Sequence, residues 1–152
     1  MTLPAQRYFE DYQLGERFAS PSRTVTESHY LRFAALTGDN HPLHYDLAYC
    51  RARGLPERLA HGLLLASLTA FGASAAAAAS HEGMVAFLEQ SARFLKPVYI
   101  GDTLTPAFEV TGLTPQRTTG LLTLATRVTN QRGETVLEGS HTYLLRRRPA
   151  AP

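Results

Sequence analysis

The chain has 152 residues, of which 44% are apolar, and this fits one domain with a proper hydrophobic core. The net charge is +2, and the run Arg146–Arg148 accounts for more than that excess, so the charge indicates neither a nucleic-acid partner nor a membrane surface. Cys50 is the single cysteine, which excludes an intrachain disulfide and a cysteine-based metal cluster.

Two stretches bear on where the protein resides. Residues 1–12 are polar, include acids and lack the basic start and apolar run of a signal peptide, so we expect a cytoplasmic protein. Residues 59–81 contain no Asp, Glu, Lys or Arg and are long enough to span a bilayer. Their second half is mostly Ala and Ser, which drive insertion weakly, and this favours a helix buried in a protein core.

The first expected elements are a strand and a helix. Residues 17–25 are predicted to form a strand that Pro21 interrupts. Thr26 suits a helix N-cap, and an acid in the first turn suits the helix dipole. Apolar residues then recur at helical spacing, which predicts a helix from about Glu27 to Leu36 that stops at Gly38.

Two further helices are expected before the main strands. A short one covers about Asp46 to Arg53 and ends at Gly54. A long one covers about Gly62 to Ser80, where alanine, the strongest helix former, predominates. The small Ala and Ser side chains on its face would let a sheet lie very close to this helix.

Strand patterns fill the remainder of the chain. Residues 118–130 alternate apolar and polar side chains, and residues 131–133 form a hairpin turn. The expected strands, with short antiparallel connections, are 84–98, 103–113, 118–130 and 134–146. One strand, then helices, then four antiparallel strands make an α+β architecture. We expect a single domain over residues 1–148 and a flexible tail over residues 149–152.

The stretch 37–44 concentrates groups that can do chemistry. It holds a carboxylate, Asp39, and an imidazole, His44, which can work together only if the chain folds back between them. Gly38 can take the left-handed conformation and Pro42 fixes its own backbone, so the stretch suits such a turn. The pair could then take a proton from water and deliver one nearby. The alternative is a helix exit whose polar residues cap one another and face water.

The second candidate stretch is His61-Gly62, at the start of the long helix. The first amides of a helix have no intrahelical partner, and the helix dipole adds partial positive charge there. Gly62 has no side chain, so a substrate oxygen can approach its N–H closely, which makes an oxyanion hole. Alternatively, His61 caps or packs, and Gly62 only permits close contact between helix and strand.

These residues resemble the MaoC-like (R)-specific enoyl-CoA hydratase family, which has the hotdog fold. The resemblance runs through residues 33–46 and resumes at residues 59–67, with a weaker third piece at residues 94–102. It implies an antiparallel sheet wrapped around a long central Ala-rich helix. It also implies that Asp39 and His44 are the catalytic pair and that the amide of Gly62 binds the thioester carbonyl.

The reaction implied by the resemblance is reversible addition of water to a trans-2-enoyl-CoA, giving an (R)-3-hydroxyacyl-CoA. Asp39 and His44 would hold the water while it adds to Cβ, a proton goes to Cα and the enolate-like oxygen rests on Gly62. We expect no cofactor, no nucleic-acid or membrane partner, and a homodimer or a dimer of dimers. Two alternatives stay open: a hotdog acyl-CoA thioesterase, and a non-catalytic acyl-CoA-binding subunit.

Further residues near the two stretches have open roles. Many family members have Asn where His41 stands, so His41 either hydrogen-bonds within the site or fills space against the helix end. Ser67 is placed to hydrogen-bond Asp39 or to bond back to its own helix. His41 and His44 have a spacing that suits a metal, but no third ligand is near in sequence, so we expect no metal site. Three arginines either meet the phosphates of CoA or form a solvated face: Arg51, Arg53 and Arg58.

Overall fold

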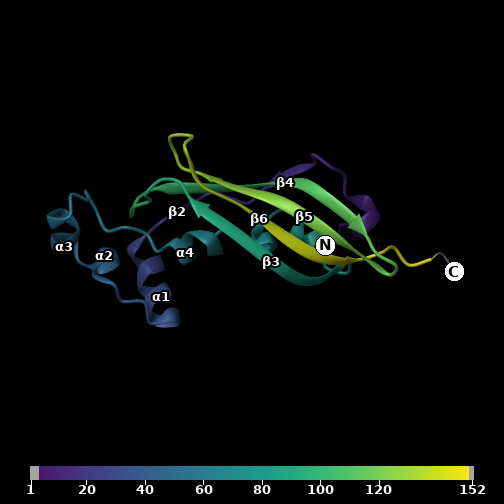
Figure 1. Cartoon of the computed structure of the whole chain (residues 1–152), viewed down its shortest axis with the longest axis horizontal. Coiled ribbons are helices and arrows are strands. Elements are labelled where there is room, and N and C mark those ends of the chain that lie inside the picture. The colour runs from purple at the N-terminus through teal and green to yellow at the C-terminus, as the bar shows by residue number, and fades with distance from the viewer. Residues whose placement is uncertain (1–3, 151–152) are drawn as a thin grey trace.

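An antiparallel sheet dominates the computed structural model, which describes residues 4–150 (Figure 1). Its strands lie in the order β1-β4-β5-β6-β3, and β2 pairs with the start of β4. The strands are β1 (Arg17–Ala19), β2 (Arg23–Thr24), β3 (Met84–Phe94), β4 (Thr103–Pro115), β5 (Thr119–Thr129) and β6 (Thr135–Arg146). The predicted order of an interrupted first strand, helices and four antiparallel strands is confirmed.

Alternation along the central strands explains which face packs. Leu122, Leu124, Thr126 and Val128 of β5 are buried, while the alternate residues 123, 125 and 127 are partly or fully exposed. β3 ends at Phe94 rather than at the predicted residue 98, because Pro97 has no amide hydrogen to add to the ladder. The strand period in the sequence therefore predicted the sheet and its buried face.

The first three helices lie together beyond one end of the sheet, and the C-terminus lies at the opposite end (Figure 1). α1 (Glu27–Thr37) ends at Gly38, whose φ of 76° is the left-handed conformation expected there. α3 (Leu47–Ala52) begins where the Asp46 carboxylate accepts a backbone hydrogen bond from its first turn. α2 (Pro42–Tyr45) is a single turn that the sequence pattern did not predict.

The prediction of one long helix over residues 62–80 is wrong. In its place are α4 (Gly62–Ser67) and two 3-10 turns, η2 (Phe71–Ala73) and η3 (Ala77–Ser80). Hydroxyl groups compete with the helical ladder; Thr69, for example, donates to the carbonyl of Ala66 at 2.7 Å. Gly72 adds its conformational entropy cost, and the propensity of alanine is too weak to override these effects. The sheet therefore packs against a broken segment rather than a continuous rod.

The predictions about the membrane and the tail meet different outcomes. Over residues 4–150, the structure has no helix that is both long and apolar enough to cross a membrane. Residues 149 and 150 follow β6 without regular secondary structure, and residues 151–152 of the predicted tail lie outside the described residues. Just before them, the backbone amide of Arg148 donates to the Glu10 carboxylate at 2.8 Å.

A buried histidine forms a chain of hydrogen bonds in the core. His141 on β6 is 2% exposed, and its ring contacts the hydroxyls of Thr69 at 3.1 Å and Tyr143 at 3.0 Å. Because the Thr69 hydroxyl already donates to a carbonyl, its oxygen accepts from Nε2–H of His141. Burial lowers the pKa of His141 and favours the neutral ring, in which Nδ1 accepts from the Tyr143 hydroxyl.

The neutral state of His141 predicts loss of stability in acid. Its folded-state pKa lies below the value near 6.5 of an unfolded histidine, so below about pH 6.5 the unfolded chain binds the extra proton. We expect His141 to remove up to ~1.4 kcal/mol of unfolding free energy per pH unit below that pH, until its own folded pKa is reached. Urea unfolding at pH 7.5 and 5.5 should show a smaller acid loss for His141→Gln than for the wild type. The exposed His81→Gln serves as the control; equal acid losses in both variants would count against this assignment.

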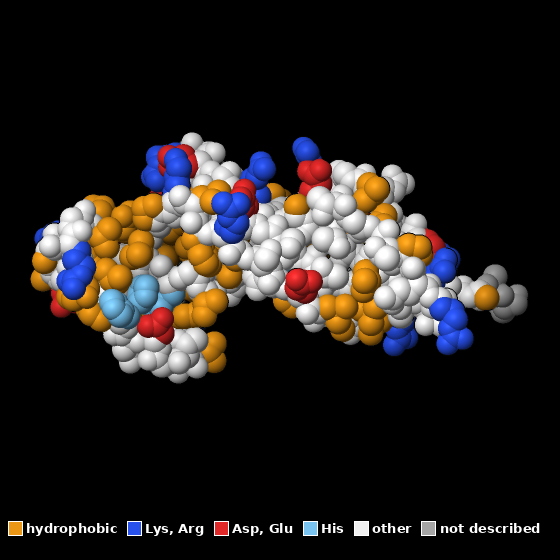
Figure 2. Space-filling view, in the orientation of Figure 1, with side chains coloured by type: hydrophobic (Ala, Val, Ile, Leu, Met, Phe, Trp, Pro, Cys, Tyr) orange, Lys and Arg blue, Asp and Glu red, His pale blue; other side chains and the backbone are white. Residues whose placement is uncertain are grey.

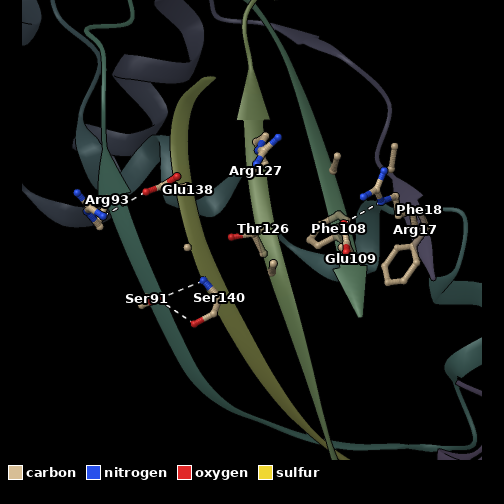
Figure 3. A pocket seen from close by; sticks show the side chains of 14 residues that line it. Arg17, Phe18, Ser91, Arg93, Phe108, Glu109, Thr126, Arg127, Glu138 and Ser140 are labelled. Atoms are coloured by element: carbon tan, nitrogen blue, oxygen red, sulfur yellow. Dashed lines mark hydrogen bonds and ion pairs between the residues drawn. The ribbon is translucent and has the colours of Figure 1, made fainter. Parts of the chain in front are cut away.

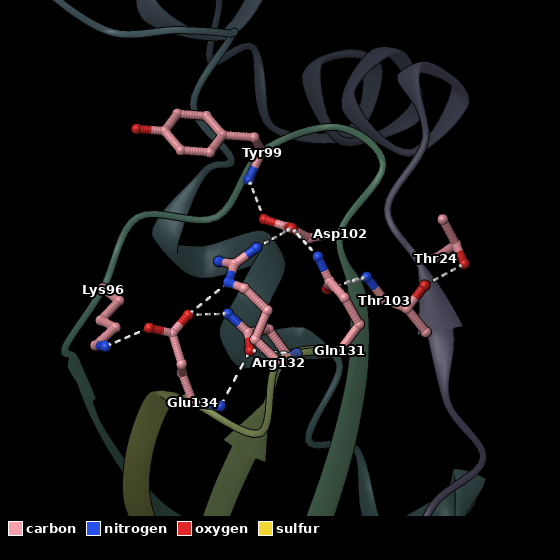
Figure 4. Close-up of polar contacts among 9 residues, drawn as sticks. Thr24, Lys96, Tyr99, Asp102, Thr103, Gln131, Arg132 and Glu134 are labelled. Carbon is pink, nitrogen blue, oxygen red and sulfur yellow. Dashed lines mark hydrogen bonds and ion pairs between the residues drawn. The ribbon is translucent and has the colours of Figure 1, made fainter.

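A polar network joins the β5–β6 turn to residues 99–102, which precede β4 (Figure 4). The Asp102 carboxylate accepts from the Tyr99 amide at 2.9 Å and from the Gln131 side chain at 2.7 Å. Tyr99 in turn forms an isolated bridge with Leu59. Three donors hold Glu134 and lower the pKa of its carboxyl to about 2: Asn130, Lys96 and Arg132. This network fixes the position of Leu59, whose carbonyl contacts a site residue.

Candidate active site

The loop between α1 and α2 folds back on itself, as the sequence predicted. After Gly38, the Asp39 carboxylate accepts a hydrogen bond from the His41 amide at 3.2 Å, which makes a tight turn. Pro42 then begins α2, and the single turn of α2 carries His44 back toward the acid. The short helix is therefore what closes the distance between the two predicted catalytic residues.

Three ionisable groups meet at this end of the molecule. A carboxylate oxygen of Asp39 and ring nitrogens of His44 and His61 all lie within 4.8 Å of one another. In Figure 2, histidine side chains gather on the surface at the end that carries α1–α3, with an acidic side chain beside them. Asp39 is exposed, His44 is half-buried and His61 is buried. The predicted convergence of Asp39 and His44 is present, and His61 joins them.

The hydrogen bond of His44 fixes which of its ring nitrogens carries the hydrogen. Nδ1 lies 2.6 Å from the carbonyl oxygen of Leu59, and a carbonyl can only accept, so Nδ1 carries the hydrogen. In the neutral ring, Nε2 then has a free lone pair. His44 is thereby oriented to accept a proton at Nε2.

His61 lies face to face with His44. Their ring centroids are 3.7 Å apart and the planes differ by 22°. His61 is 2% exposed, and burial, reinforced by the neighbouring His44, lowers its pKa. A neutral His61 can stack on His44 without charge repulsion, so its observed contacts are those of a packing partner for the reactive ring.

Tyr45 is a contact residue that the sequence analysis did not assign. Its hydroxyl lies 2.8 Å from Nε2 of His61, and its single hydrogen is within reach of two backbone carbonyls, those of Asp39 at 3.0 Å and Tyr30 at 3.2 Å. Burial, and then the charge of Asp39, raises the pKa of Tyr45. The phenol contacts the loop between α1 and α2, α1 itself and the residue before α4, so it holds these three segments together.

The start of α4 lies directly beside the stacked histidines. His61 is the N-cap of α4 and Gly62 is its first helical residue. Among residues 4–150, no acceptor takes the amide hydrogen of Gly62. A Cβ at this position would lie 3.1 Å from the ring of Phe94 on β3, so glycine also permits this close packing. Both sequence interpretations of Gly62 thus fit the structure.

Two other predicted site residues have local partners. Nδ1 of His41 accepts the Leu43 amide at 3.2 Å, so the His41 side chain caps α2 and forms no hydrogen bond with the side chains of Asp39 or His44. The Ser67 hydroxyl donates to the Leu64 carbonyl at 2.7 Å, within its own helix. The structure therefore shows no bond between Ser67 and Asp39, and it favours the alternative of back-bonding.

The third ionisable group reopens the question of a metal. Sequence spacing identified only His41 and His44 as a pair, whereas the structure groups Asp39, His44 and His61. A metal binds an imidazole in the plane of the ring at about 2.0–2.1 Å. The rings of His44 and His61 lie in nearly parallel planes with centroids 3.7 Å apart, so their lone pairs do not converge on one point. This geometry suits a stacked pair and does not suit a shared metal ion.

A large hollow on the sheet is lined by other residues (Figure 3). It has a volume of about 750 Å³ and crosses the sheet from β1 to β3. Four of the charged groups that line it form two ion pairs, Arg17 with Glu109 at 2.8 Å and Arg93 with Glu138 at 3.2 Å. Neither Asp39 nor His44 lines it.

A second cavity lies along the same segment that carries Gly62. It has a volume of about 490 Å³ and begins at Ala66, one helical turn after Gly62. Its walls are mainly apolar, with Phe71 of η2 and Phe87 of β3 among them, and no Asp, Glu, Lys or Arg lines it. This cavity has room for an uncharged chain.

Comparison with known families shows to which family the chain belongs. The model of the MaoC-like domain matches residues 11–132. The chain belongs to the MaoC-like family. In this member of the family, the rings of His44 and His61 are stacked and the amide of Gly62 at the start of α4 has no acceptor among the described residues.

Individual relatives of this MaoC-like protein agree over most of its length. An (R)-specific enoyl-CoA hydratase from Rhodospirillum rubrum is 36% identical over 139 residues, which cover 91% of each chain. The solved (R)-hydratase from A. caviae has a TM-score of 0.75 at 30% identity, covering 92% of this chain and 99% of that one. A monoamine oxidase regulatory protein from Archaeoglobus fulgidus has a TM-score of 0.90 at 34% identity, covering 98% and 100%. A solved structure described as a double hotdog fold matches with a TM-score of 0.81 at 28% identity, so the predicted hotdog fold is confirmed, apart from its long central helix.

Proposed function

We propose that this MaoC-like protein adds water reversibly to trans-2-enoyl-CoA and gives (R)-3-hydroxyacyl-CoA, with Asp39 and His44 as the catalytic pair. The observation that carries the proposal is their convergence beside an unpartnered amide at the start of α4. The similarity to proteins named (R)-specific enoyl-CoA hydratase and (R)-hydratase supports the reaction type.

The geometry supports a mechanism in which one water is held by two acceptors. The water donates to Nε2 of His44, which has a free lone pair, and to the carboxylate of Asp39. Its oxygen adds to Cβ of the enoyl group, and the proton it loses passes through this pair to Cα. The N–H of Gly62 stabilises the negative charge on the thioester oxygen until Cα is protonated. Hydrogen and hydroxyl are thereby added across the double bond, with no other reactant.

The cavity beyond α4 suits the acyl chain of such a substrate. A thioester carbonyl at Gly62 places the chain beside α4, and the cavity that begins at Ala66 lies further along the same element. Because its lining lacks charged side chains, we propose that it accepts uncharged acyl chains.

Crotonyl-CoA tests the proposed reaction. The protein should remove the absorbance of the enoyl thioester and form (R)-3-hydroxybutyryl-CoA, as determined by chiral analysis. Release of free thiol would instead identify a thioesterase. If crotonyl-CoA and longer enoyl-CoA substrates all remain unchanged, the protein is a non-catalytic binding subunit and the proposal fails.

We also propose a homodimer joined through β3. β3 is an outer strand of the sheet and leaves large apolar side chains exposed on both sides of the strand: Val85, Phe87, Leu88 and Phe94. Unpaired strand edges of this kind are usually covered in native proteins. Pairing with the same strand of a second copy would cover the edge by a twofold interface.

A charge on β3 should dissociate the dimer. We expect the wild type to have twice the chain mass in light scattering at micromolar concentration, and Leu88→Glu to have the mass of one chain, because the carboxylate would be desolvated at the interface. Leu14→Glu is the matched control, since Leu14 is 66% exposed and Leu88 is 54% exposed. A wild type with the mass of one chain would refute the dimer.

A further inference from the structure

The three arginines between the two site stretches have different environments. Arg58 is committed to acids, at 2.5 Å from Glu27 and 3.2 Å from Glu57. In the part of the chain that the structure describes, Arg51 and Arg53 form no ion pair with a carboxylate. Both are exposed at the C-terminal end of α3. The structure therefore leaves two of the three cations available to a ligand.

Arg53 has a specific geometry as well as a charge. Its guanidinium carbon lies 3.6 Å from the centre of the Tyr49 ring, so the cation lies over the ring face. The dipole at the end of α3 favours a cation there, but it does not require this contact with Tyr49. A guanidinium held over a ring keeps its N–H edges for phosphate and its outer face for another planar group. Such a site fits a nucleotide, which carries both a phosphate and a planar base.

A series of rings connects Arg53 to the catalytic loop. The Tyr49 ring lies 6.1 Å from the ring of His41, and His41 lies 6.2 Å from the ring of His44. When a CoA thioester is held at His44, the pantetheine arm and nucleotide attached to its sulfur must extend away from the buried His61. His41 and Arg53 are exposed, so this row offers an open path across α2 and α3. The row leads from the reacting atoms to the unpaired guanidinium.

We infer that Arg53, stacked on Tyr49, forms the site for the nucleotide end of CoA, where its phosphates and adenine bind, with Arg51 adding positive charge. This inference rests on the proposed function for the position of the thioester. The open face and the fork of N–H groups favour a phosphorylated nucleotide over the acidic surface of an acyl carrier protein. The row of rings then sets the direction in which bound CoA extends from the catalytic pair to the surface.

Binding of free CoA tests the inference without requiring catalysis. Isothermal titration should show that Arg53→Ala weakens CoA binding about 10- to 100-fold, the range expected for a charge-assisted contact to phosphate. Arg53→Lys should lose part of this affinity, because it keeps the charge without the planar group. Arg117→Ala removes an exposed arginine from the β4–β5 turn and should bind CoA like the wild type. Equal affinities for CoA in Arg53→Ala and Arg117→Ala would overturn the inference.

Kinetics with truncated substrates provide the second readout. For Arg53→Ala we expect KM for crotonyl-CoA to rise at least tenfold with kcat unchanged, while kcat/KM for crotonyl-pantetheine, which lacks the nucleotide, stays within twofold of the wild type. An equal loss with both substrates would show that Arg53 only supports the fold, and a loss confined to crotonyl-acyl carrier protein would assign the surface to that protein. If CoA binding depends on Arg53 but no enoyl thioester is hydrated, the inference holds and the proposed function fails.

Discussion

Asp39→Asn should lower kcat for hydration of crotonyl-CoA by about 10²- to 10⁴-fold, the usual contribution of a general acid or base. The amide cannot accept a proton from the attacking water, yet its oxygen can still accept the hydrogen bond that the His41 amide gives to Asp39. The fold should therefore persist, with a melting temperature close to that of the wild type. Steady-state kinetics and thermal unfolding on the same samples check both parts.

His44→Asn is the matched change on the imidazole. The asparagine amide can donate to the Leu59 carbonyl in place of Nδ1–H, but it has no counterpart of Nε2. We expect a loss of kcat in the same range as for Asp39→Asn. His41→Asn is the control, because His41 caps α2 and asparagine is also a good N-cap. A catalytic loss in His41→Asn as large as in His44→Asn would contradict the assignment of the pair.

Gly62→Pro should lower kcat by about 10²- to 10³-fold, as expected when an oxyanion-hole donor is removed. Proline has no N–H, and it is well tolerated as the first residue of a helix, which is the position of Gly62. His61 already has φ of −62° and ψ of 133°, the extended geometry that a residue before proline prefers. The substitution therefore removes the donor with little change to the backbone.

Gly62→Ala separates the donor from the added side chain. Both variants introduce a Cβ that would lie 3.1 Å from the Phe94 ring, and Phe94 is half-exposed and can shift. Alanine keeps the N–H, so we expect it to lose about tenfold or less in kcat, with a thermal destabilisation similar to that of proline. Equal kcat values for the two variants would show that the amide of Gly62 does not stabilise the transition state.

Local signals in the sequence predicted much of the fold. The helix from Glu27 stops at Gly38 because only a residue tolerant of positive φ fits there, and the residue type alone indicates this. The alternation in residues 118–130 identified the buried face of β5, since a period of two leaves few alternatives. Where the conformation depends only on residues a few positions apart, as at these two places, the sequence was sufficient to predict the structure.

Effects that depend on tertiary neighbours were less predictable. Alanine propensity suggested one helix through Ser80, but hydroxyl bonds and packing against the sheet break the segment after Ser67. Ser67 itself bonds within α4, a choice that spacing could not decide. Sequence alone did not show that Tyr45 contacts His61, because these residues are brought together only when α2 packs on the start of α4.

The candidate site shows the same division between local and long-range contacts. Asp39 and His44 could be paired from the residues between them, because Gly38 and Pro42 constrain a short turn. The stacking of His61 on His44 joins residues 17 positions apart, and its 3.7 Å geometry argues against the metal that a group of three ligands would otherwise suggest. The packing geometry thus adds information that a motif cannot contain.

The claim that one water is held jointly by two acceptors is tested most directly by the double variant Asp39→Asn/His44→Asn. Groups that act as a unit are non-additive, so the double variant should have a kcat no more than about threefold below that of the slower single variant. If the two losses multiply instead, Asp39 and His44 contribute independently and do not share a single catalytic water.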